Sequence, residues 1–420
     1  MKAYQFSQSY QGDAFRLFSF FRDRPHAFFL DSSLHRRNSQ FSYIGFSPID
    51  VVDNLTDLKR IFKKHQLTSK LNFPAGAVGY LGYDGPVHFG IYDTIMAVDH
   101  RQKRLIISSL SKGRIKDILR EIQPCQHRVL TMSTPGVAEV ADLHSNFTKE
   151  EYIQAVRQAL EHIRRGDIYQ INLSHQLKLK LPNWQKYASS LDIYGHLRQA
   201  FPSEFGAYFD DGKQVILSAS PERFLKLEKG LVQVKPMKGT RPRGETKAQD
   251  RRLKEELLKS QKEKAELLMV TDLERNDLGR VCEYSSVRVK AMRSIESYSS
   301  VFQATSTIEG RLRRNCDQFD LLQATFPSGS VTGCPKIEAM KIISDLERGS
   351  RGLYTGALGY MSFSGDLDFN VMIRTMFLRK DQITFHVGGG IVADSKPEDE
   401  WQETWDKAKP LIETLEKSFQ

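Results

Sequence analysis

The arrangement of hydrophobic and polar residues predicts a chain that mixes β-strands with isolated helices. Short apolar runs bounded by polar or glycine-containing turns are typical of strands, and they occur at 27–30, 104–107, 168–181, 357–361 and 383–387. These runs do not alternate with helical patterns in a regular βαβ repeat. The pattern therefore favours an α+β fold with antiparallel sheets.

Helical patterns are clearest in the second part of the chain. Thr148 and Glu151 have the spacing of a capping box, and Phe147 stands where a hydrophobic staple would lie. Apolar residues then recur on one helix face until Gly166 and Asp167, where the helix is expected to end. Three further helices are predicted at 247–270, 335–346 and 397–415.

Residues 123–146 have the composition of a linker. They include Pro124, Pro135 and Gly136 among polar residues, with weak periodicity. This segment divides the chain into an N-terminal region, 1–122, and a longer C-terminal region, 147–420.

Charge and cysteine usage narrow the classes of function. The formal net charge is +10, which is consistent with a diffuse positive surface or with attraction of an anionic substrate. Basic and acidic residues are interleaved, as at 254–256, which argues against nucleic acid as a partner. Four cysteines lack metal-ligand spacing and favour a reducing compartment; they are Cys125, Cys282, Cys316 and Cys334.

The hydropathy of the chain indicates no membrane partner. Residues 1–21 are interrupted by polar side chains and lack the apolar core of a signal peptide. No apolar run approaches the length needed to cross a bilayer. We therefore expect a cytoplasmic protein.

Two familiar motifs are present only in part. Gly388–Ala393 fits G-x-G-x-x-A after an apolar strand, but Asp394, Ser395 and Pro397 precede the next predicted helix. A dinucleotide site needs the helix to open inside the motif, so this interpretation is disfavoured. No cysteine lies in a glycine-flanked nucleophile turn, which indicates that the chain does not make its own ammonia from glutamine.

Carboxylates on two predicted helices suggest a metal site. Glu400 and Glu403 are three residues apart, so both can face the same side of one helix, and Glu266 lies on another. Oxygen ligands of this kind suit Mg²⁺. The alternative for each is a glutamate that only faces solvent.

Other polar residues lie beside apolar runs. Arg374 could bind a carboxylate or form a structural ion pair. The glycines at 388–390 could offer backbone N–H groups to an anion or form a tight turn. Glu222 and Lys238 could act as proton donor and nucleophile, or as an ordinary ion pair.

Taken together, these segments resemble the chorismate-utilising enzymes, from about Phe147 to the C-terminus. The motifs that carry the resemblance are Gly-Asp-Ile-Tyr-Gln-Ile-Asn-Leu at 166–173, Ser-Pro-Glu at 220–222, Lys-Gly-Thr-Arg-Pro-Arg at 238–243, Ala-Glu at 265–266, Asp-Leu-Glu-Arg-Asn-Asp at 272–277, Thr-Gly-Cys-Pro-Lys at 332–336, Ile-Arg-Thr at 373–375, and the segments 388–395 and 400–404. Residues 1–122 resemble the N-terminal region of anthranilate synthase component I more weakly, through the segments 29–32 and 42–45. The resemblance implies one intertwined unit with two large, mostly antiparallel sheets packed together and flanked by helices in α/β/β/α layers.

The resemblance also implies roles for individual residues. Mg²⁺ would bridge Glu266 and Glu403 to the ring carboxylate of chorismate, with Glu400 close by or acting through water. Glu222 would protonate the departing C4 hydroxyl. The substrate-binding residues would be Arg374, Tyr360, Gly389, Gly390, Thr240, Thr332 and Lys336.

Three positions favour one branch of the family. Lys238 resembles the aminodeoxychorismate-forming enzymes, whereas anthranilate synthases usually carry alanine there; the lysine would attack C2 before ammonia adds at C4. Gln170 stands near the place where isochorismate and salicylate synthases have a water-activating lysine. Thr332 also fits the aminodeoxychorismate pattern better than the serine common in anthranilate synthases.

The expected function is thus amination of chorismate at C4 to 4-amino-4-deoxychorismate, on the route to p-aminobenzoate and folate. Ammonia would come from a separate glutaminase subunit. The alternatives are anthranilate synthase component I, of tryptophan biosynthesis, and a catalytically silent binding subunit. Leu267, Gln303 and Cys334 depart from the residues usual in relatives.

Overall fold

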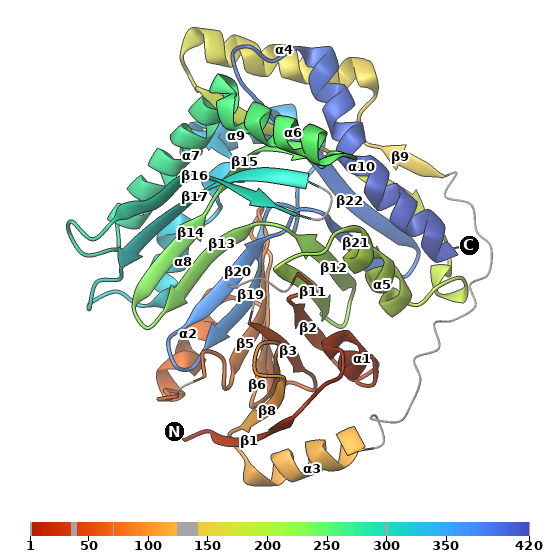
Figure 1. Cartoon of the computed structure of the whole chain (residues 1–420), viewed down its shortest axis with the longest axis vertical. Coiled ribbons are helices and arrows are strands. Elements are labelled where there is room, and N and C mark those ends of the chain that lie inside the picture. The colour runs from red at the N-terminus through yellow and green to blue at the C-terminus, as the bar shows by residue number, and fades with distance from the viewer. Residues whose placement is uncertain (1, 35–39, 70, 124–141, 299–300, 420) are drawn as a thin grey trace.

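The structure is a computed structural model that describes residues 2–34, 40–69, 71–123, 142–298 and 301–419. Two antiparallel sheets dominate these residues (Figure 1). The first sheet has the strand order β1-β8-β7-β3-β2-β11-β12-β21-β22-β10-β18, with β9 paired to β10. The second has the order β15-β17-β14-β13-β20-β19-β5-β6-β4, with β16 paired to β17.

The strands of the first sheet are β1 (Tyr4–Ser9), β2 (Phe28–Asp31), β3 (Phe41–Gly45), β7 (Thr94–Asp99), β8 (Arg104–Ser109), β9 (Leu143–Ser145), β10 (Gln170–Lys180), β11 (Phe205–Asp210), β12 (Val215–Ser220), β18 (Gly333–Cys334), β21 (Thr375–Arg379) and β22 (Gln382–Ile391). Those of the second are β4 (Asp50–Val52), β5 (Gly76–Leu81), β6 (Val87–Tyr92), β13 (Arg223–Glu228), β14 (Leu231–Lys235), β15 (Met237–Pro242), β16 (Arg288–Ser297), β17 (Val301–Arg311), β19 (Ala357–Ser362) and β20 (Leu367–Val371).

The helices are α1 (Ala14–Ser19), α2 (Leu55–Lys64), α3 (Lys112–Ile122), α4 (Lys149–Arg165), α5 (Ser190–Ala200), α6 (Lys247–Lys259), α7 (Gln261–Gly279), α8 (Gln318–Thr325), α9 (Lys336–Leu346) and α10 (Pro397–Phe419). Two short 3₁₀ helices, η2 (Trp184–Lys186) and η3 (Gly329–Val331), complete the described elements.

The three largest apolar cores of the described residues lie between these layers. The core between the sheets joins aromatic and aliphatic side chains of β5 and β19 to those of β2, β11 and β21, including Tyr80, Leu358, Phe28, Phe209 and Phe377. A second core lies between the first sheet and α1, α3, α5 and α10, and a third between the second sheet and α2, α7 and α8. The expected α/β/β/α arrangement of two antiparallel sheets is confirmed.

Local sequence signals account for the start and end of α4. The Thr148 hydroxyl accepts a hydrogen bond from the Glu151 N–H, and the Glu151 side chain accepts one from the Thr148 N–H, which completes the predicted capping box. At the other end Gly166 has φ of +80°, a conformation that glycine adopts without steric cost. The predicted helix from Thr148 to Gly166 is therefore confirmed.

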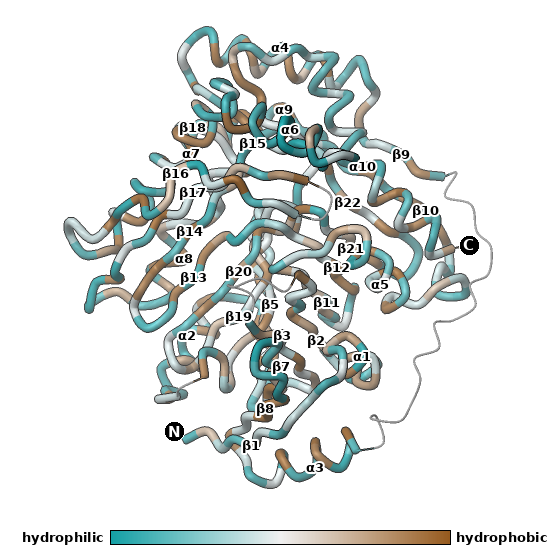
Figure 2. The backbone as a smooth tube through the Cα atoms, viewed as in Figure 1, coloured by the Kyte–Doolittle hydropathy of each residue, from teal (hydrophilic) through white to brown (hydrophobic). Residues whose placement is uncertain are grey.

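One predicted helix proved wrong in its extent. The segment 247–270 forms two helices, α6 and α7, that meet at Ser260. Ser260 has ψ of 118° and its side chain accepts a hydrogen bond from the Glu263 N–H, so it ends one helix and caps the next. Figure 2 shows α6 as mostly hydrophilic, and Leu257 is its buried residue.

Strands from before residue 123 and after residue 146 are interleaved in both sheets. In the first sheet β11 pairs with β2, and in the second β19 pairs with β5. The predicted linker is described only at its ends, where Leu143–Ser145 pairs with β10 as β9; the rest of it, 124–141, lies outside the described residues. Among the helices that the structure describes, none has the length and apolarity to cross a membrane.

Candidate active site

The polar residues expected to carry chemistry gather between β15 of one sheet and β22 of the other, with further members from α7 and α10. Lys238 is on β15, Glu266 on α7 and the triple glycine on β22, while α10 supplies Glu400 and Glu403. Because the two sheets meet here, residues more than a hundred positions apart in sequence form one polar cluster.

Lys238 is the central cation of this cluster. An atom placed as a Cβ on Gly390 would lie 3.2 Å from Lys238 Nζ, which shows how closely the amine approaches β22. Burial lowers the pKa of Lys238, while the nearby carboxylates of Glu266 and Glu222 act in the opposite direction. A lysine with a lowered pKa has more of its amine in the nucleophilic, uncharged form.

Glu222 lies in the turn between β12 and β13 and is 4% exposed. Burial raises the pKa of its carboxyl to about 7. Ser330 and Lys238 lower this pKa, and the charge of Glu274 raises it further. Its Oε1 is buried without a hydrogen-bond partner among the described residues. The group is thus partly protonated at neutral pH, as a general acid needs to be.

Glu400 and Glu403 both face β22, as their spacing predicts. A Cβ on Gly389 would lie 3.1 Å from Glu400 Oε2 and 3.8 Å from Glu403 Oε1. Glu400 Oε1 accepts a hydrogen bond of 2.6 Å from Ser395, and its Oε2 is buried without a partner among the described residues. Burial raises the pKa of Glu400, and the charge of Glu403 adds to this effect.

The remaining carboxylate and two lysines balance the charge of the cluster. Burial raises the pKa of Glu266, and Glu403 adds to this, whereas Lys238 and Lys262 lower it. Burial alone would raise the pKa of Glu403, but the positive charge of Lys407 outweighs this and lowers the pKa. Glu403 Oε1 lies 2.7 Å from Lys407 Nζ.

These carboxylates fit a divalent cation only in part. Among the described residues, no three His, Cys, Asp or Glu side chains lie close enough together to hold a metal on their own. Mg²⁺ in enzymes is commonly held by one or two carboxylates, with water and substrate oxygens completing the shell. The unpartnered Glu400 Oε2 and the adjacent Glu403 match such a partial shell.

The triple glycine belongs to a strand, so the alternative of a tight turn is wrong. Gly388, Gly389 and Gly390 pair with residues 174, 173 and 172 of β10 in β22. Side chains at Gly389 and Gly390 would press on Glu400 and on Lys238, respectively. Glycine at these positions lets the strand backbone approach the polar groups closely, and a methyl group there would have to move the ends of those side chains by a few tenths of an ångström.

Arg374 follows β20 in a left-handed conformation, with φ of 50°. Burial lowers the pKa of its guanidinium, which lies 5.1 Å from the ring centroid of Phe201. No acidic side chain forms an ion pair with it in the part of the chain that the structure describes. A structural ion pair, the alternative weighed above, is therefore not seen, and carboxylate binding by Arg374 stays a prediction.

The structure does not bring Tyr360 to this cluster, which corrects the expected substrate-binding set. Tyr360 belongs to the core between the sheets, where its ring stacks on Phe73 at 4.4 Å and meets Tyr43 edge-on. It lines a cavity of about 70 Å³ together with Asp31 and Ser32. Successive residues of a strand point to opposite faces, and Tyr360 points to the face that is shared with β2 and β3.

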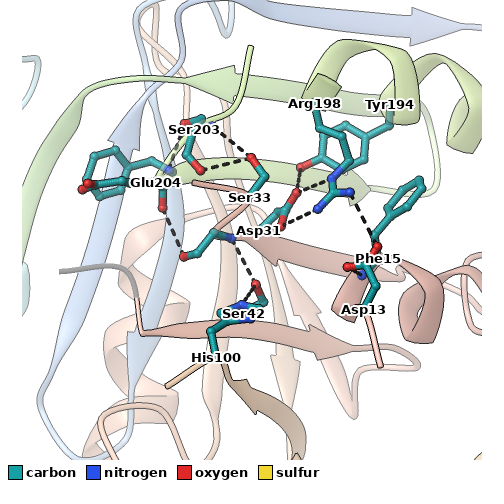
Figure 3. A network of polar contacts seen from close by, with 12 residues as sticks. Asp13, Phe15, Asp31, Ser33, Ser42, His100, Tyr194, Arg198, Ser203 and Glu204 are labelled. Carbon is teal, nitrogen blue, oxygen red and sulfur yellow. Dashed lines mark hydrogen bonds and ion pairs between the residues drawn. The ribbon is translucent and has the colours of Figure 1, made fainter. Parts of the chain in front are cut away.

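That second location contains a dense polar network (Figure 3). Asp31 accepts a hydrogen bond of 2.9 Å from Arg198 Nε and one of 3.3 Å from the Tyr194 hydroxyl. The Ser32 hydroxyl donates to the backbone oxygens of Phe41 and Glu204. These contacts join the N-terminal strands to β11 and α5 and are separate from the Lys238 cluster.

The three other predicted residues differ in their surroundings. Lys336 Nζ lies 2.5 Å from Asp277 Oδ2 and donates to the Thr325 carbonyl oxygen, which ties α9 to α7. The Thr332 hydroxyl is buried and donates to the carbonyl oxygen of Ser328. Thr240 is exposed on β15, two residues beyond Lys238. Substrate contacts by these residues stay predictions.

Sequence reasoning did not single out Lys407, and it noted Gln170 only as the residue near the position of a water-activating lysine in relatives. Gln170 is 2% exposed, and its Nε2 would lie 3.0 Å from a Cβ on Gly390. Lys407 donates a hydrogen bond of 2.8 Å to the Gly388 carbonyl oxygen. Its position four residues after Glu403 was the available signal, because such residues share a helix face.

Two of the departures from relatives now have a location. Leu267 packs in the core between α6, α7 and β17, so it faces away from the polar cluster. Gln303 lies on β17 opposite Thr240, is 2% exposed, and has a buried Oε1 without a partner among the described residues.

Comparison with known proteins agrees with this arrangement. Residues 58–413 match the family model described as chorismate binding enzyme. Anthranilate synthase component 1 of Aquifex aeolicus (strain VF5) is 37% identical over 398 residues, which cover 87% of this chain and 79% of that protein. Aminodeoxychorismate synthase component 1 of Bacillus subtilis (strain 168) is 32% identical over 450 residues, with 94% and 93% covered.

A solved relative has the same architecture. The crystal structure of anthranilate synthase component I from Streptococcus pneumoniae TIGR4 superposes with a TM-score of 0.79 at 29% identity, covering 90% of this chain and 93% of that one. The family match spans most of the chain, and it includes every residue of the polar cluster from Gln170 to Lys407. The chain therefore belongs to the family of chorismate binding enzymes.

Proposed function

We propose that this enzyme aminates chorismate at C4 to give 4-amino-4-deoxychorismate. The observation that carries the proposal is the half-buried Lys238, whose amine lies beside the glycines of β22 and close to the carboxylates of Glu222 and Glu266. A purely structural lysine would be expected to form a close ion pair, and none is found for Lys238 among the described residues.

The two central groups have complementary protonation states. Burial lowers the pKa of Lys238 and raises that of Glu222 to about 7. The amine can thus add to C2 of the ring while Glu222 gives its proton to the C4 hydroxyl, which leaves as water. Ammonia then adds at C4 and the amine of Lys238 departs, so nitrogen is delivered to C4 and the ring is not aromatised.

Substrate orientation would depend on the carboxylates of chorismate. Glu266 and Glu403 would supply protein oxygens for Mg²⁺, with Glu400 close by or acting through water, and the bound ion would offset the negative charge of the ring carboxylate. Arg374 is the cation proposed for a substrate carboxylate, because it is half-buried and forms no ion pair with an acidic side chain among the described residues.

The ammonia source is proposed to be a separate glutaminase subunit. Both relatives named above are called component 1 of their synthases. Since the cysteines of this chain lack the surroundings of a glutaminase nucleophile, the second component would supply ammonia.

Formation of anthranilate is the second candidate. It is favoured by the 37% identity to an anthranilate synthase component, against 32% for the aminodeoxychorismate synthase component. Lys238 favours the first candidate, because direct attack of ammonia at C2 requires no protein nucleophile and would have to compete with the lysine for that carbon.

The deciding experiment is identification of the product by mass. The purified chain is given chorismate, Mg²⁺ and ammonium at alkaline pH, with and without a glutaminase and glutamine. A non-aromatic amino acid with the mass of aminodeoxychorismate supports the proposal, and fluorescent anthranilate contradicts it.

A lysine variant tests the covalent route in the same assay. Lys238→Ala is expected to lower product formation about 10²-fold or more, because the nucleophile is lost. Lys264→Ala removes an exposed lysine of α7 and serves as the matched control. Unchanged turnover by Lys238→Ala would show that the amine takes no part in the reaction.

A further inference from the structure

One edge of β10 is held by side chains instead of by a strand. On this edge β18 pairs with residues 170–171 and β9 pairs with residues 177–179. Between them, residues 172–176 have no paired strand on this side among the residues that the structure describes. Buried backbone groups need hydrogen-bond partners, so other groups must fill the gap.

Arg351 and Glu347 fill a large part of it. Arg351 Nη2 donates hydrogen bonds of 2.7 Å to the Asn172 carbonyl oxygen and of 2.7 Å to Glu347 Oε1. Arg351 Nε donates one of 2.8 Å to Glu347 Oε2, so the pair is bidentate. Glu347 Oε1 in turn accepts 2.7 Å and 2.9 Å hydrogen bonds from the N–H and hydroxyl of Ser174. The Arg351 and Glu347 side chains are 1% and 6% exposed, respectively.

The same guanidinium also fixes the end of η3. Arg351 Nη1 donates a hydrogen bond of 2.8 Å to the Val331 carbonyl oxygen, and the Asn172 N–H donates one of 2.7 Å to the Thr332 carbonyl oxygen. One planar group thus sets the separation between β10 and residues 331–332. A lysine has a single nitrogen and cannot reach all these acceptors in the same geometry.

The strand segment held in this way faces Lys238. Gln170 and Asn172 are two residues apart, so they lie on the same face of β10. Asn172 pairs directly with Gly390, where a Cβ would lie 3.2 Å from Lys238 Nζ and 3.0 Å from Gln170 Nε2. Gln170 Oε1 and Asn172 Oδ1 are both buried without a hydrogen-bond partner among the described residues. Two free acceptors therefore lie on the face of the sheet that the amine approaches.

We propose that the Arg351–Glu347 pair is a positioning device, which holds these two amide oxygens as hydrogen-bond acceptors for the reacting amines. When a nitrogen adds to a ring carbon it gains positive charge, and its N–H groups become stronger donors. An acceptor that is already fixed in place stabilises this state without having to reorient. The inference rests on the proposed amination, but it holds for attack at either C2 or C4.

Arg351→Lys separates positioning from support. The lysine keeps a positive charge beside Glu347 but loses the fork that reaches Asn172 and Val331. The kcat is expected to fall about tenfold or more, because a small misplacement of a catalytic group can cost up to ~10²-fold. The KM for chorismate should change little, since its carboxylates would be held by Arg374 and Mg²⁺.

A double variant shows whether Arg351 acts through Asn172. Asn172→Leu removes the acceptor oxygen at similar volume and should lower kcat about tenfold or more. The combination with Arg351→Lys should lose clearly less than the product of the two single losses, because both changes affect the same contact. Losses that simply multiply would contradict the proposal. Arg348→Lys changes an exposed arginine that is paired with Glu151, and this matched control should keep the parent kcat.

Hydrogen–deuterium exchange tests the contact without turnover. The Ser174 N–H should exchange faster in Arg351→Lys than in the parent, because Glu347 is then held less firmly. Unchanged exchange would overturn the proposal, as would an Arg351→Lys enzyme with a lowered Tm but the parent kcat, which would indicate a purely structural ion pair. Failure of the proposed function is seen separately, as a parent enzyme without turnover or as a Lys238→Ala variant with the parent rate.

Discussion

Replacing Glu222 by glutamine should stabilise the folded protein while removing its activity. The carboxyl is 4% exposed, and burial raises its pKa from an ordinary 4.5 to about 7. In the unfolded chain the group ionises near its ordinary value. Below pH 4.5 it is uncharged in both states and contributes no penalty; the penalty grows between pH 4.5 and 7, and above pH 7 it is fully present.

The magnitude follows from the two pKa values. One pKa unit corresponds to about 1.4 kcal/mol, so the full penalty above pH 7 is ~3 kcal/mol. A buried glutamine amide with imperfect hydrogen bonds costs about 1–2 kcal/mol, but this cost does not change with pH. The informative quantity is therefore the difference between two pH values, which is ~2.5 kcal/mol from pH 5 to pH 8.5.

Thermal unfolding of parent and variant at both pH values measures this difference. The change in Tm equals the change in unfolding free energy divided by the unfolding entropy, which grows with chain length. For a chain of this length, ~2.5 kcal/mol corresponds to ~3 °C. The Tm of Glu222→Gln minus that of the parent should thus be about 3 °C larger at pH 8.5 than at pH 5. The turnover of the variant should fall about 10²-fold or more. Glu338→Gln, on the surface of α9, should show no such dependence. A Tm difference that is equal at the two pH values would refute the claim that Glu222 is buried with a raised pKa.

Other substitutions test neighbouring parts of the site. Gly390→Ala should leave the fold intact but reduce kcat/KM about tenfold or more, because the new methyl group displaces the amine of Lys238, 3.2 Å away. Steady-state kinetics measure the loss of activity, and circular dichroism checks that the fold is retained. Glu400→Gln should raise the Mg²⁺ concentration for half-maximal rate at least ~10-fold, and an unchanged Mg²⁺ titration would remove Glu400 from the metal site. Lys336→Met should lower the unfolding free energy by about 3–5 kcal/mol in urea, because it leaves the Asp277 carboxylate buried and unpaired; adding Asp277→Asn should recover much of the loss.

Residue patterns predicted local structure best where one short-range interaction decides it. The capping box of Thr148 and Glu151 and the terminal Gly166 located α4 within one residue. The break at Ser260 was missed because a serine within a charged, Gly-free segment looks like a tolerated helix residue; its capping hydrogen bond is visible only in three dimensions.

Site residues were predictable where spacing along one element brings them together, as for Glu400 and Glu403. Tyr360 was misplaced because the face of a strand depends on the sheet against which it packs, and here the neighbours of Tyr360 come from the N-terminal strands.

The division of the reactive groups between two sheets has a mechanical consequence. The amine of Lys238 belongs to β15, and the glycines that it approaches belong to β22. The distance between them therefore depends on how the two sheets pack against each other. Well-packed interiors transmit small displacements. Replacing Phe209, in the core between the two sheets, by a smaller residue would thus change the position of the Lys238 amine relative to the glycines of β22. Turnover would decline well before the molecule began to melt.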